Sequence, residues 1–323
     1  MLFKLKLVTI ALAAAAATPA LADYPERDIT LIVPYAAGSN VDAAARYMAD
    51  RLQEGLDTTI VIENKPGAGG IIGADYVSRA EADGYTMLFT TSSAMAVAPA
   101  VETKVRYKPL TDFEPVAGLL SGGAILQVSN TLPVGTLDEL IAYGKEHQGE
   151  LSYGSPGIGT VQHMAGASFA EGAGLDLLHV PYGSNADATV ALLGGFLQIL
   201  FGPSGPAAAN LESGKVNVLA AMGPSRALEL PHVPTVAELG HPELEQPSAW
   251  FGFFLPAGAP KEVQNRLIDA AETTFSDPEV ATYIERFGLN ADSLMTGDAL
   301  RELNAKDLGL FGALGASIGL VGK

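Results

Sequence analysis

The sequence contains no cysteine. Disulfides, a thiol nucleophile and a lipid-modified N-terminal cysteine are therefore excluded for this chain. Basic residues are also few, with 19 Lys and Arg against 36 Asp and Glu and a formal net charge of -17. Because phosphate affinity depends on clustered cations, we expect no nucleic acid partner and no anionic membrane surface. Any anion that binds must be held by local dipoles.

Residue sets for catalysis, metals and cofactors are scarce. The five histidines, at positions 147, 163, 179, 232 and 241, never fall at the i, i+4 spacing of a helical zinc site. The stretch Gly202-Pro203-Ser204-Gly205 lacks the spacer of a nucleophile elbow. Residues 67–73 are rich in glycine, but they depart from G-x-G-x-x-G and predict a tight turn. We therefore expect no enzyme, no metal and no cofactor.

The N-terminus has the pattern of an export signal. Lys4 and Lys6 precede an apolar run from Leu7 to Ala17, and Ala20-Leu21-Ala22 is a small-x-small cleavage site. A membrane anchor is the alternative, but about 20 apolar residues are needed to cross a bilayer and this run is shorter. The pattern predicts a signal peptide over residues 1–22 and a periplasmic protein that is soluble after cleavage.

The remaining residues predict two α/β units. The 48% of hydrophobic residues is typical of a globular chain, and its length favours two domains. Apolar runs predict strands at 29–33, 59–62, 87–90, 124–128, 151–153, 177–180, 198–201, 216–222 and 251–256, and helical spacing predicts helices at 41–52, 70–80, 136–146, 161–170, 186–193, 261–275, 278–287 and 298–311. Alternating strands and helices predict mostly parallel sheets flanked by helices.

The order of these elements gives the lobe boundaries. The pattern restarts after a region punctuated by proline, and helical segments follow the second run of strands. We expect the first lobe at 23–121 and 223–323, and the second lobe at 122–222. The apolar, glycine-rich tail from Gly309 is expected to dock on the first lobe.

Two loops that join a strand to a helix are candidates for an anion site. The first contains Tyr35, Ala36, Ala37, Gly38, Ser39, Asn40 and Asp42, and the second contains Ser155, Pro156, Gly157, Ile158, Gly159 and Thr160. Small residues let backbone N–H groups approach an anion closely, and Asp42 would cap the helix that follows. A plain strand-to-helix connection remains the alternative for each loop. His163, one turn into the second helix, is more often a capping or core residue than a ligand.

Several segments together resemble one known family. They are 24–27 with 29–46, 63–70, 155–163, 179–182, 192–195, 230–240 and 250–260. In this order they resemble the Bug family of periplasmic receptors, the TctC-like solute-binding proteins of tripartite tricarboxylate transporters. The resemblance implies a two-lobed periplasmic binding protein of the Venus-flytrap type, type II-like, whose cleft binds a small carboxylate. It also implies a membrane transporter as partner and adds Ser92 and Ser93 to the cleft.

Three positions depart from the family pattern. Ser39 replaces the second glycine of a Gly-Gly pair, and Gly183-Ser184-Asn185 follows Tyr182 where the family often has Lys-Gly. Gly202 stands where the family often has an acid that receives an amino group. Tyr182, Asn185 and Gly202 are therefore candidate cleft residues, and a carboxylate without an ammonium group is favoured.

The function expected from the sequence is that of a receptor. It captures a small carboxylate with backbone N–H groups of two opposed loops, as a monomer, and delivers it to a membrane transporter. A sensory co-receptor for the same ligands is an alternative that the sequence leaves open. A secreted hydrolase is less favoured, because no nucleophile, base and metal set is present.

Overall fold

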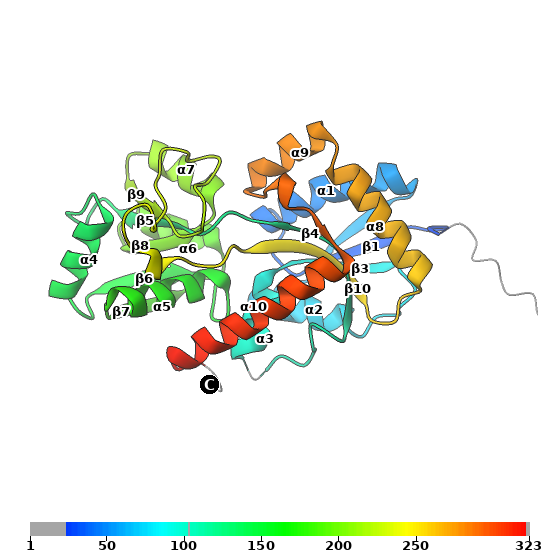
Figure 1. Cartoon of the computed structure of the whole chain (residues 1–323), viewed down its shortest axis with the longest axis horizontal. Helices are drawn as coiled ribbons and strands as arrows, with labels where there is room; N and C mark the ends of the chain where they lie inside the picture. The colour runs from blue at the N-terminus through cyan, green and yellow to red at the C-terminus, as the bar shows by residue number, and fades with distance from the viewer. Residues whose placement is uncertain (1–23, 103, 321–323) are drawn as a thin grey trace, which may run out of the picture.

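The computed structural model describes residues 24–102 and 104–320. The signal peptide predicted at 1–22 lies outside the described residues. The described chain forms two lobes side by side along the long axis of the molecule, each built on one sheet with helices on both faces (Figure 1). This arrangement confirms the predicted two-lobed α/β fold.

The first lobe is built on a six-stranded sheet with the order β11-β4-β10-β3-β1-β2. Its strands are β1 (Ile29–Val33), β2 (Ile60–Asn64), β3 (Thr86–Thr91), β4 (Phe113–Leu120), β10 (Trp250–Pro256) and β11 (Met295–Thr296). Its helices are α1 (Asn40–Leu56), α2 (Ile71–Val77), α3 (Ala98–Val101), α8 (Lys261–Phe275), α9 (Pro278–Ile284) and α10 (Gly297–Ser317), with a π-helix at Ser93–Val97.

Neighbouring residues along each strand serve opposite faces of this sheet. Leu31 and Phe253 pack under α1 and α8, while Ile32 and Phe254 pack under α2 and α10. This alternation follows from the two-residue repeat of a strand. Trp250 is also fully buried here, so the aromatic segment that begins at this residue is core.

The second lobe is built on a five-stranded sheet with the order β7-β6-β8-β5-β9. Its strands are β5 (Ile125–Ser129), β6 (Leu151–Ser155), β7 (Leu177–Pro181), β8 (Ile199–Gly202) and β9 (Val216–Ala221). Helices α4 (Leu137–Glu146) and α5 (Val161–Ala173) cover one face, and α6 (Asn185–Leu193) and α7 (Ser204–Glu212) cover the other.

Both sheets are mixed rather than mostly parallel. The pairs β1–β2, β1–β3, β6–β7 and β6–β8 are parallel, whereas β10 runs antiparallel to β3 and β4, and β5 runs antiparallel to β8 and β9. The antiparallel pairs involve the strands next to the two passages between the lobes. Parallel neighbours need a crossover, usually a helix, that returns the chain to the same sheet. Where the chain passes from one sheet to the other, this crossover is absent and the neighbouring strands pair antiparallel.

The two chain segments that connect the lobes lie against each other, and Gly223 of the second lobe lies close to the first of them. The chain enters the second lobe through 121–124, and a Cβ placed on Gly123 would lie 2.3 Å from the backbone nitrogen of Gly223. Ser121 N also donates to Ala249 O at 2.7 Å. The main chains are in direct contact, so a side chain at Gly123 is excluded and the passages form one narrow junction.

Residues 223–249 pack mainly on the second lobe. Leu230 and Val233 share a core cluster with Ile125 under α7, and Val236 and Leu244 belong to the cluster on the opposite face of the same sheet. We therefore propose that the second lobe extends to about residue 249. The sequence placed this boundary at 222, because no strand follows β9 until β10.

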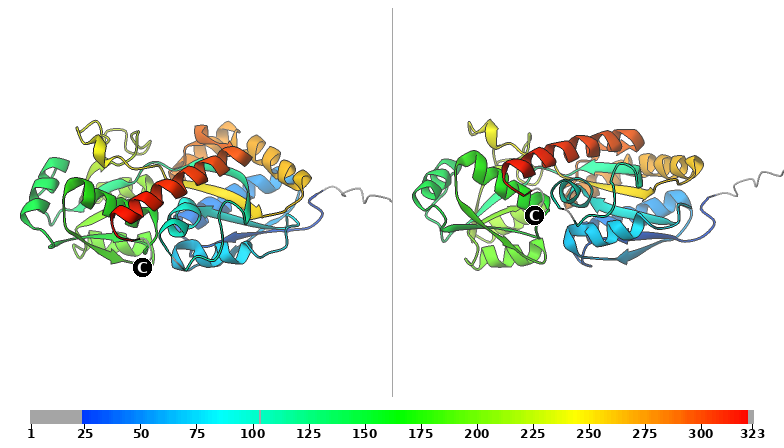
Figure 2. Two further views of the ribbon diagram at one scale, coloured as in Figure 1. Left: turned by 60° about the horizontal axis from the view of Figure 1, so that its bottom comes forward. Right: turned by 90° about the horizontal axis from the view of Figure 1, so that it is seen from below.

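Helix α10 contacts both lobes. Leu300 packs under the first sheet, whereas Phe311 packs with Val161 and Met164 of α5. Ser317 Oγ donates to Glu171 at 3.0 Å, and Figure 2 shows the helix, in red, running from the first lobe to the second. The tail was expected to dock on the first lobe alone, but its last turns lie against the second.

Candidate ligand-binding cleft

The first loop is fixed by a buried carboxylate. Asp42 is 2% exposed. Its oxygens accept from Gly38 N at 2.8 Å, from Asn64 Nδ2 at 2.8 Å and from Arg46 Nε and Nη2 at 3.0 Å each. Ser39 caps α1, because its Oγ accepts from Asp42 N at 3.2 Å. The loop is therefore held in one shape before any ligand arrives.

The pKa of Asp42 reflects these contacts. Burial acts to raise it, but the bonds from Arg46, Asn64 and Gly38 outweigh burial and hold the pKa below its usual value. A carboxylate whose pKa falls on folding stabilises the fold above its unfolded pKa and loses that contribution as the pH drops through the folded value. Asp42 thus remains charged, and the loop braced, throughout the neutral range.

The backbone N–H groups of this loop divide into used and unused donors. Gly38 N donates to Asp42, and Ser39 N donates to Ala36 O at 3.1 Å. Within 24–102 and 104–320, no residue accepts from Ala36 N, Ala37 N or Asn40 N. Tyr35 N and Val41 N also have no described acceptor, so the loop offers a run of free donors that includes Ala36, Ala37 and Asn40.

The second loop is arranged in the same way. Gly157 N donates to Ser155 Oγ at 3.1 Å and Gly159 N donates to His163 Nδ1 at 3.3 Å. Thr160 caps α5, because its Oγ1 accepts from His163 N at 3.3 Å. The described part of the chain supplies no acceptor for Ile158 N or Thr160 N. The glycines shape the loop, and their neighbours present the free donors.

Two stacked histidine rings contact the second loop. The rings of His163 and His179 are 4.0 Å apart, and Tyr153 lies 4.9 Å from His179. His179 Nε2 is 2.7 Å from Ser155 Oγ, the hydroxyl that also accepts from Gly157 N. Burial lowers the pKa of His163 to about 4, assisted by the neighbouring His179, and burial alone lowers the pKa of His179 to about 4. Both rings are therefore neutral at pH 7.

These histidines predict that the protein is less stable in acid. The unfolded chain binds protons near pH 6.5, whereas the folded rings resist them until about pH 4, so stability is complete above 6.5 and is lost as the pH falls. We expect the free energy of unfolding to drop by about 3–4 kcal/mol between pH 7 and pH 5, with the two rings contributing about equally. Urea unfolding at several pH values measures this slope.

Two substitutions test the origin of the slope. His179→Asn should remove roughly half of it, since one of the two rings is lost. His232→Asn is the matched control, because His232 is exposed to solvent. An unchanged slope in His179→Asn would show that other groups cause the acid sensitivity.

The second loop faces the first lobe at close range. A Cβ on Gly69 would lie 3.5 Å from Thr160 Cγ2, and a Cβ on Gly159 would lie 2.8 Å from Glu102 Oε1. Ser93 Oγ accepts from Val161 N at 3.1 Å across the two lobes. The glycine turn at residues 67–70 and Glu102 are thus parts of the cleft wall that the sequence did not indicate.

The other predicted cleft residues have structural contacts of their own. Ser92 Oγ accepts from Trp250 N at 3.4 Å, so it joins the cleft to β10. Tyr182 N donates to Ser155 O at 2.8 Å. Asn185 begins α6, and its enclosed Oδ1 has no donor among the described residues. A Cβ on Gly202 would lie 2.8 Å from Gln127 Nε2, so the absence of a side chain leaves room for this amide.

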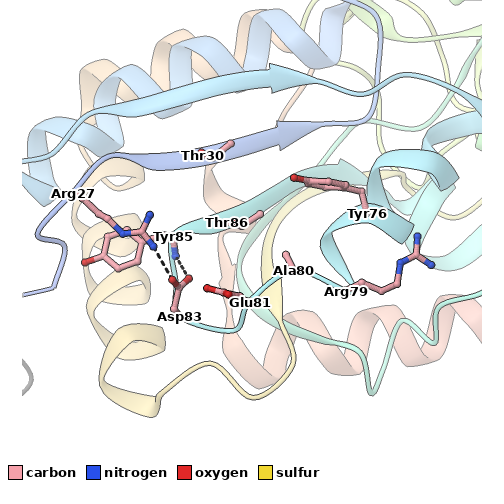
Figure 3. Close-up of a pocket in the computed structure, with 9 residues that line it drawn as sticks. All are labelled: Arg27, Thr30, Tyr76, Arg79, Ala80, Glu81, Asp83, Tyr85 and Thr86. Carbon is pink, nitrogen blue, oxygen red and sulfur yellow. Dashed lines mark hydrogen bonds and ion pairs between the residues drawn. The ribbon is translucent and has the colours of Figure 1, made fainter.

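A separate groove of about 550 Å³ lies at the amino ends of β1 and β3, away from both loops (Figure 3). Arg27 lies over the ring of Tyr85 and pairs with Asp83 at 2.7 Å, while Arg79 pairs with Asp75. Both arginines of this groove are therefore already paired with carboxylates.

Over the described ranges, no group of three or more His, Asp and Glu side chains is arranged to hold a metal ion.

The geometry agrees with comparisons to known proteins. Residues 44–313 match the family model described as tripartite tricarboxylate transporter family receptor. The chain belongs to this family. It is therefore a solute-binding receptor and not an enzyme, which confirms the prediction from the sequence.

Three solved structures illustrate the family. The periplasmic binding protein BugD is 30% identical, with a TM-score of 0.83 over 92% of this chain and 99% of that protein. R. palustris Rpa4515 with adipate is 28% identical, with a TM-score of 0.85 over the same shares. MatC from Rhodopseudomonas palustris with bound malate is 27% identical, with a TM-score of 0.82 over 90% of this chain and 99% of that one. One of these relatives is named as a periplasmic binding protein, and the other two were solved with adipate and with malate.

In the ranges 24–102 and 104–320, every helix is too short or too polar to traverse a bilayer.

Proposed function

We propose that this protein is a periplasmic receptor that holds a carboxylate between the two loops and hands it to a membrane transporter. The observation that carries the proposal is the set of unused N–H groups on both sides of the cleft. Ala36, Ala37 and Asn40 supply them from one lobe, and Ile158 and Thr160 supply them from the other.

Backbone donors suit an anion in a strongly acidic protein. The net charge of -17 repels anions at long range, so attraction must come from groups at contact distance. Hydrogen bonds to a charged acceptor contribute about 1.5–3 kcal/mol each. Several backbone donors together can therefore hold a carboxylate without a lysine or arginine. Adipate and malate, bound by the two Rhodopseudomonas relatives, are acids of this kind.

Domain closure provides the mechanism. The ligand satisfies donors of both loops only when the lobes approach, so its differential affinity for the closed state shifts the equilibrium. The hydrogen bond from Ser121 N to Ala249 O joins the two connecting segments and supplies a narrow junction about which such a movement can occur. A membrane transporter that recognises the closed arrangement would then receive the loaded receptor.

The proposal is tested by thermal unfolding in the presence of a panel of acids. Mono-, di- and tricarboxylates are compared, each with its neutral amide as a matched control. A ligand at 100 times its dissociation constant adds about 2.7 kcal/mol to the stability. We expect at least one carboxylate to stabilise the protein and its amide to have no effect. Equal stabilisation by acids and amides, or none by any acid, would contradict the proposal.

A further inference from the structure

The carboxylate of Glu229 has an unusual position between the lobes. Glu229 lies on the segment that follows β9. Its Oε1 is enclosed by protein and has no hydrogen-bond donor in the described part of the chain. A Cβ placed on Gly205 of α7 would lie 3.9 Å from this oxygen, and a Cβ placed on Gly288 of the first lobe would lie 3.8 Å from it. The oxygen is thus sandwiched between the two lobes.

This position is continuous with the cleft. Gly205 is three residues beyond Gly202, at the carboxyl end of β8, and a Cβ on Gly288 would lie 3.2 Å from Ser204 Oγ. On the other side, Phe287 O accepts from Asn40 Nδ2 at 3.2 Å, which ties this wall to the first loop. Glu229 therefore lies between the two lobes, beside the segment of the first lobe that bonds to the first loop.

No cation of the same segment neutralises Glu229. Arg226, three residues earlier, is bound to both oxygens of Glu238 at 3.1 and 2.8 Å and to Pro231 O at 3.0 Å. An enclosed acceptor without a donor is unfavourable, and a charged one more so. The cost applies to the arrangement in which Gly205 of one lobe and Gly288 of the other both enclose the oxygen.

We infer that Glu229 selects ligands that bring a hydrogen-bond donor, a hydroxyl or an ammonium group, in addition to a carboxylate. Such a donor satisfies Oε1 at closure, whereas an acid without one leaves it unpaired. Gly202 provides no acid at the position where the family often has one, and Glu229 supplies the acceptor from a different segment. The inference rests on the proposed function, because it concerns the same cleft.

The test uses matched ligands that differ only in the donor. Succinate, malate and aspartate form one such set, and glutarate, 2-hydroxyglutarate and glutamate form a second. Titration calorimetry on the whole receptor gives each dissociation constant. We expect a donor-bearing acid to bind at least about 5-fold more tightly than its parent acid, since an unpaired buried acceptor has a penalty of about 1–3 kcal/mol.

Three variants assign the effect to Glu229. Glu229→Ala should bring the ratio between matched acids to within about 3-fold, mainly because the parent acids bind better. Glu229→Gln keeps an acceptor oxygen but no charge, so it should retain the preference for a hydroxyl and lose the preference for an ammonium group. Glu245→Ala removes an exposed acid further along the segment and should change no ratio. Since no described donor bonds to Glu229 Oε1, these variants should fold normally.

The outcomes separate the two claims. If acids bind but the ratio is the same in the natural protein and in Glu229→Ala, Glu229 has no such role and the proposed function stands. If no acid of either set or of the wider panel binds, both claims are overturned.

Discussion

Replacing Gly159 with valine is expected to lower the affinity for the carboxylate ligand by at least about 100-fold, the loss of one or two charge-assisted hydrogen bonds. Gly159 has a φ of +71°, a conformation that β-branched residues avoid, and a Cβ there would lie 2.8 Å from Glu102 Oε1. The loop must shift, and the free N–H groups of Ile158 and Thr160 shift with it. Titration calorimetry against the acid identified in the panel measures the loss.

The matched control is Gly174→Val. Gly174 has a φ of +68° with open space around it. It lies at the C-terminal end of α5, whereas the second loop leads into the N-terminal end of the same helix. The backbone strain is therefore equal, while the cleft is untouched. We expect lower stability and unchanged affinity in the control. Affinity within about 3-fold of the natural protein in Gly159→Val would remove the second loop from the site.

Replacing Asp42 with alanine is expected to lower both stability and affinity. The change removes the buried carboxylate that accepts from Arg46, Asn64 and Gly38, so these donors lose their shared partner. Arg46 is half exposed and recovers some hydration, so we expect the free energy of unfolding to fall by about 2–3 kcal/mol. Urea unfolding measures this loss, and titration calorimetry measures the accompanying drop in affinity of at least about 10-fold.

Asp50→Ala is the control on the same helix. Asp50 is exposed and bonds to Arg51 and Gln53 at the surface, where water replaces the lost contacts. We expect an unchanged midpoint and unchanged affinity. If Asp42→Ala bound the ligand as well as the natural protein does, the braced first loop would be irrelevant to recognition.

Elements with a local signal were predicted well from the sequence. The capping box at Thr136 is present, since its Oγ1 accepts from Glu139 N and Glu139 Oε2 accepts from Thr136 N, both at 3.2 Å. Strand β4 and helix α7 were missed because each contains proline. Pro115 lies at the β-bulge where β4 pairs with β10, and Pro206 lies in the first turn of α7, where a missing N–H is tolerated.

The sequence predicted two candidate loops but not which of their N–H groups remain free. The sequence indicated that Gly38, Gly157 and Gly159 would permit close approach of a ligand. It could not show that their own N–H groups are already used by Asp42, Ser155 and His163, because those bonds depend on the folded loops. The position of Glu229 between the lobes could not be predicted either, because it depends on the packing of residues 223–249.

The central claim is that main-chain N–H groups of both loops hold the carboxylate. A crystal structure of the protein with its acid tests it most directly. The account predicts carboxylate oxygens within hydrogen-bond distance of Ala36, Ala37 or Asn40 N on one side and of Ile158 or Thr160 N on the other. A carboxylate held by lysine or arginine side chains, with neither loop in contact, would contradict it.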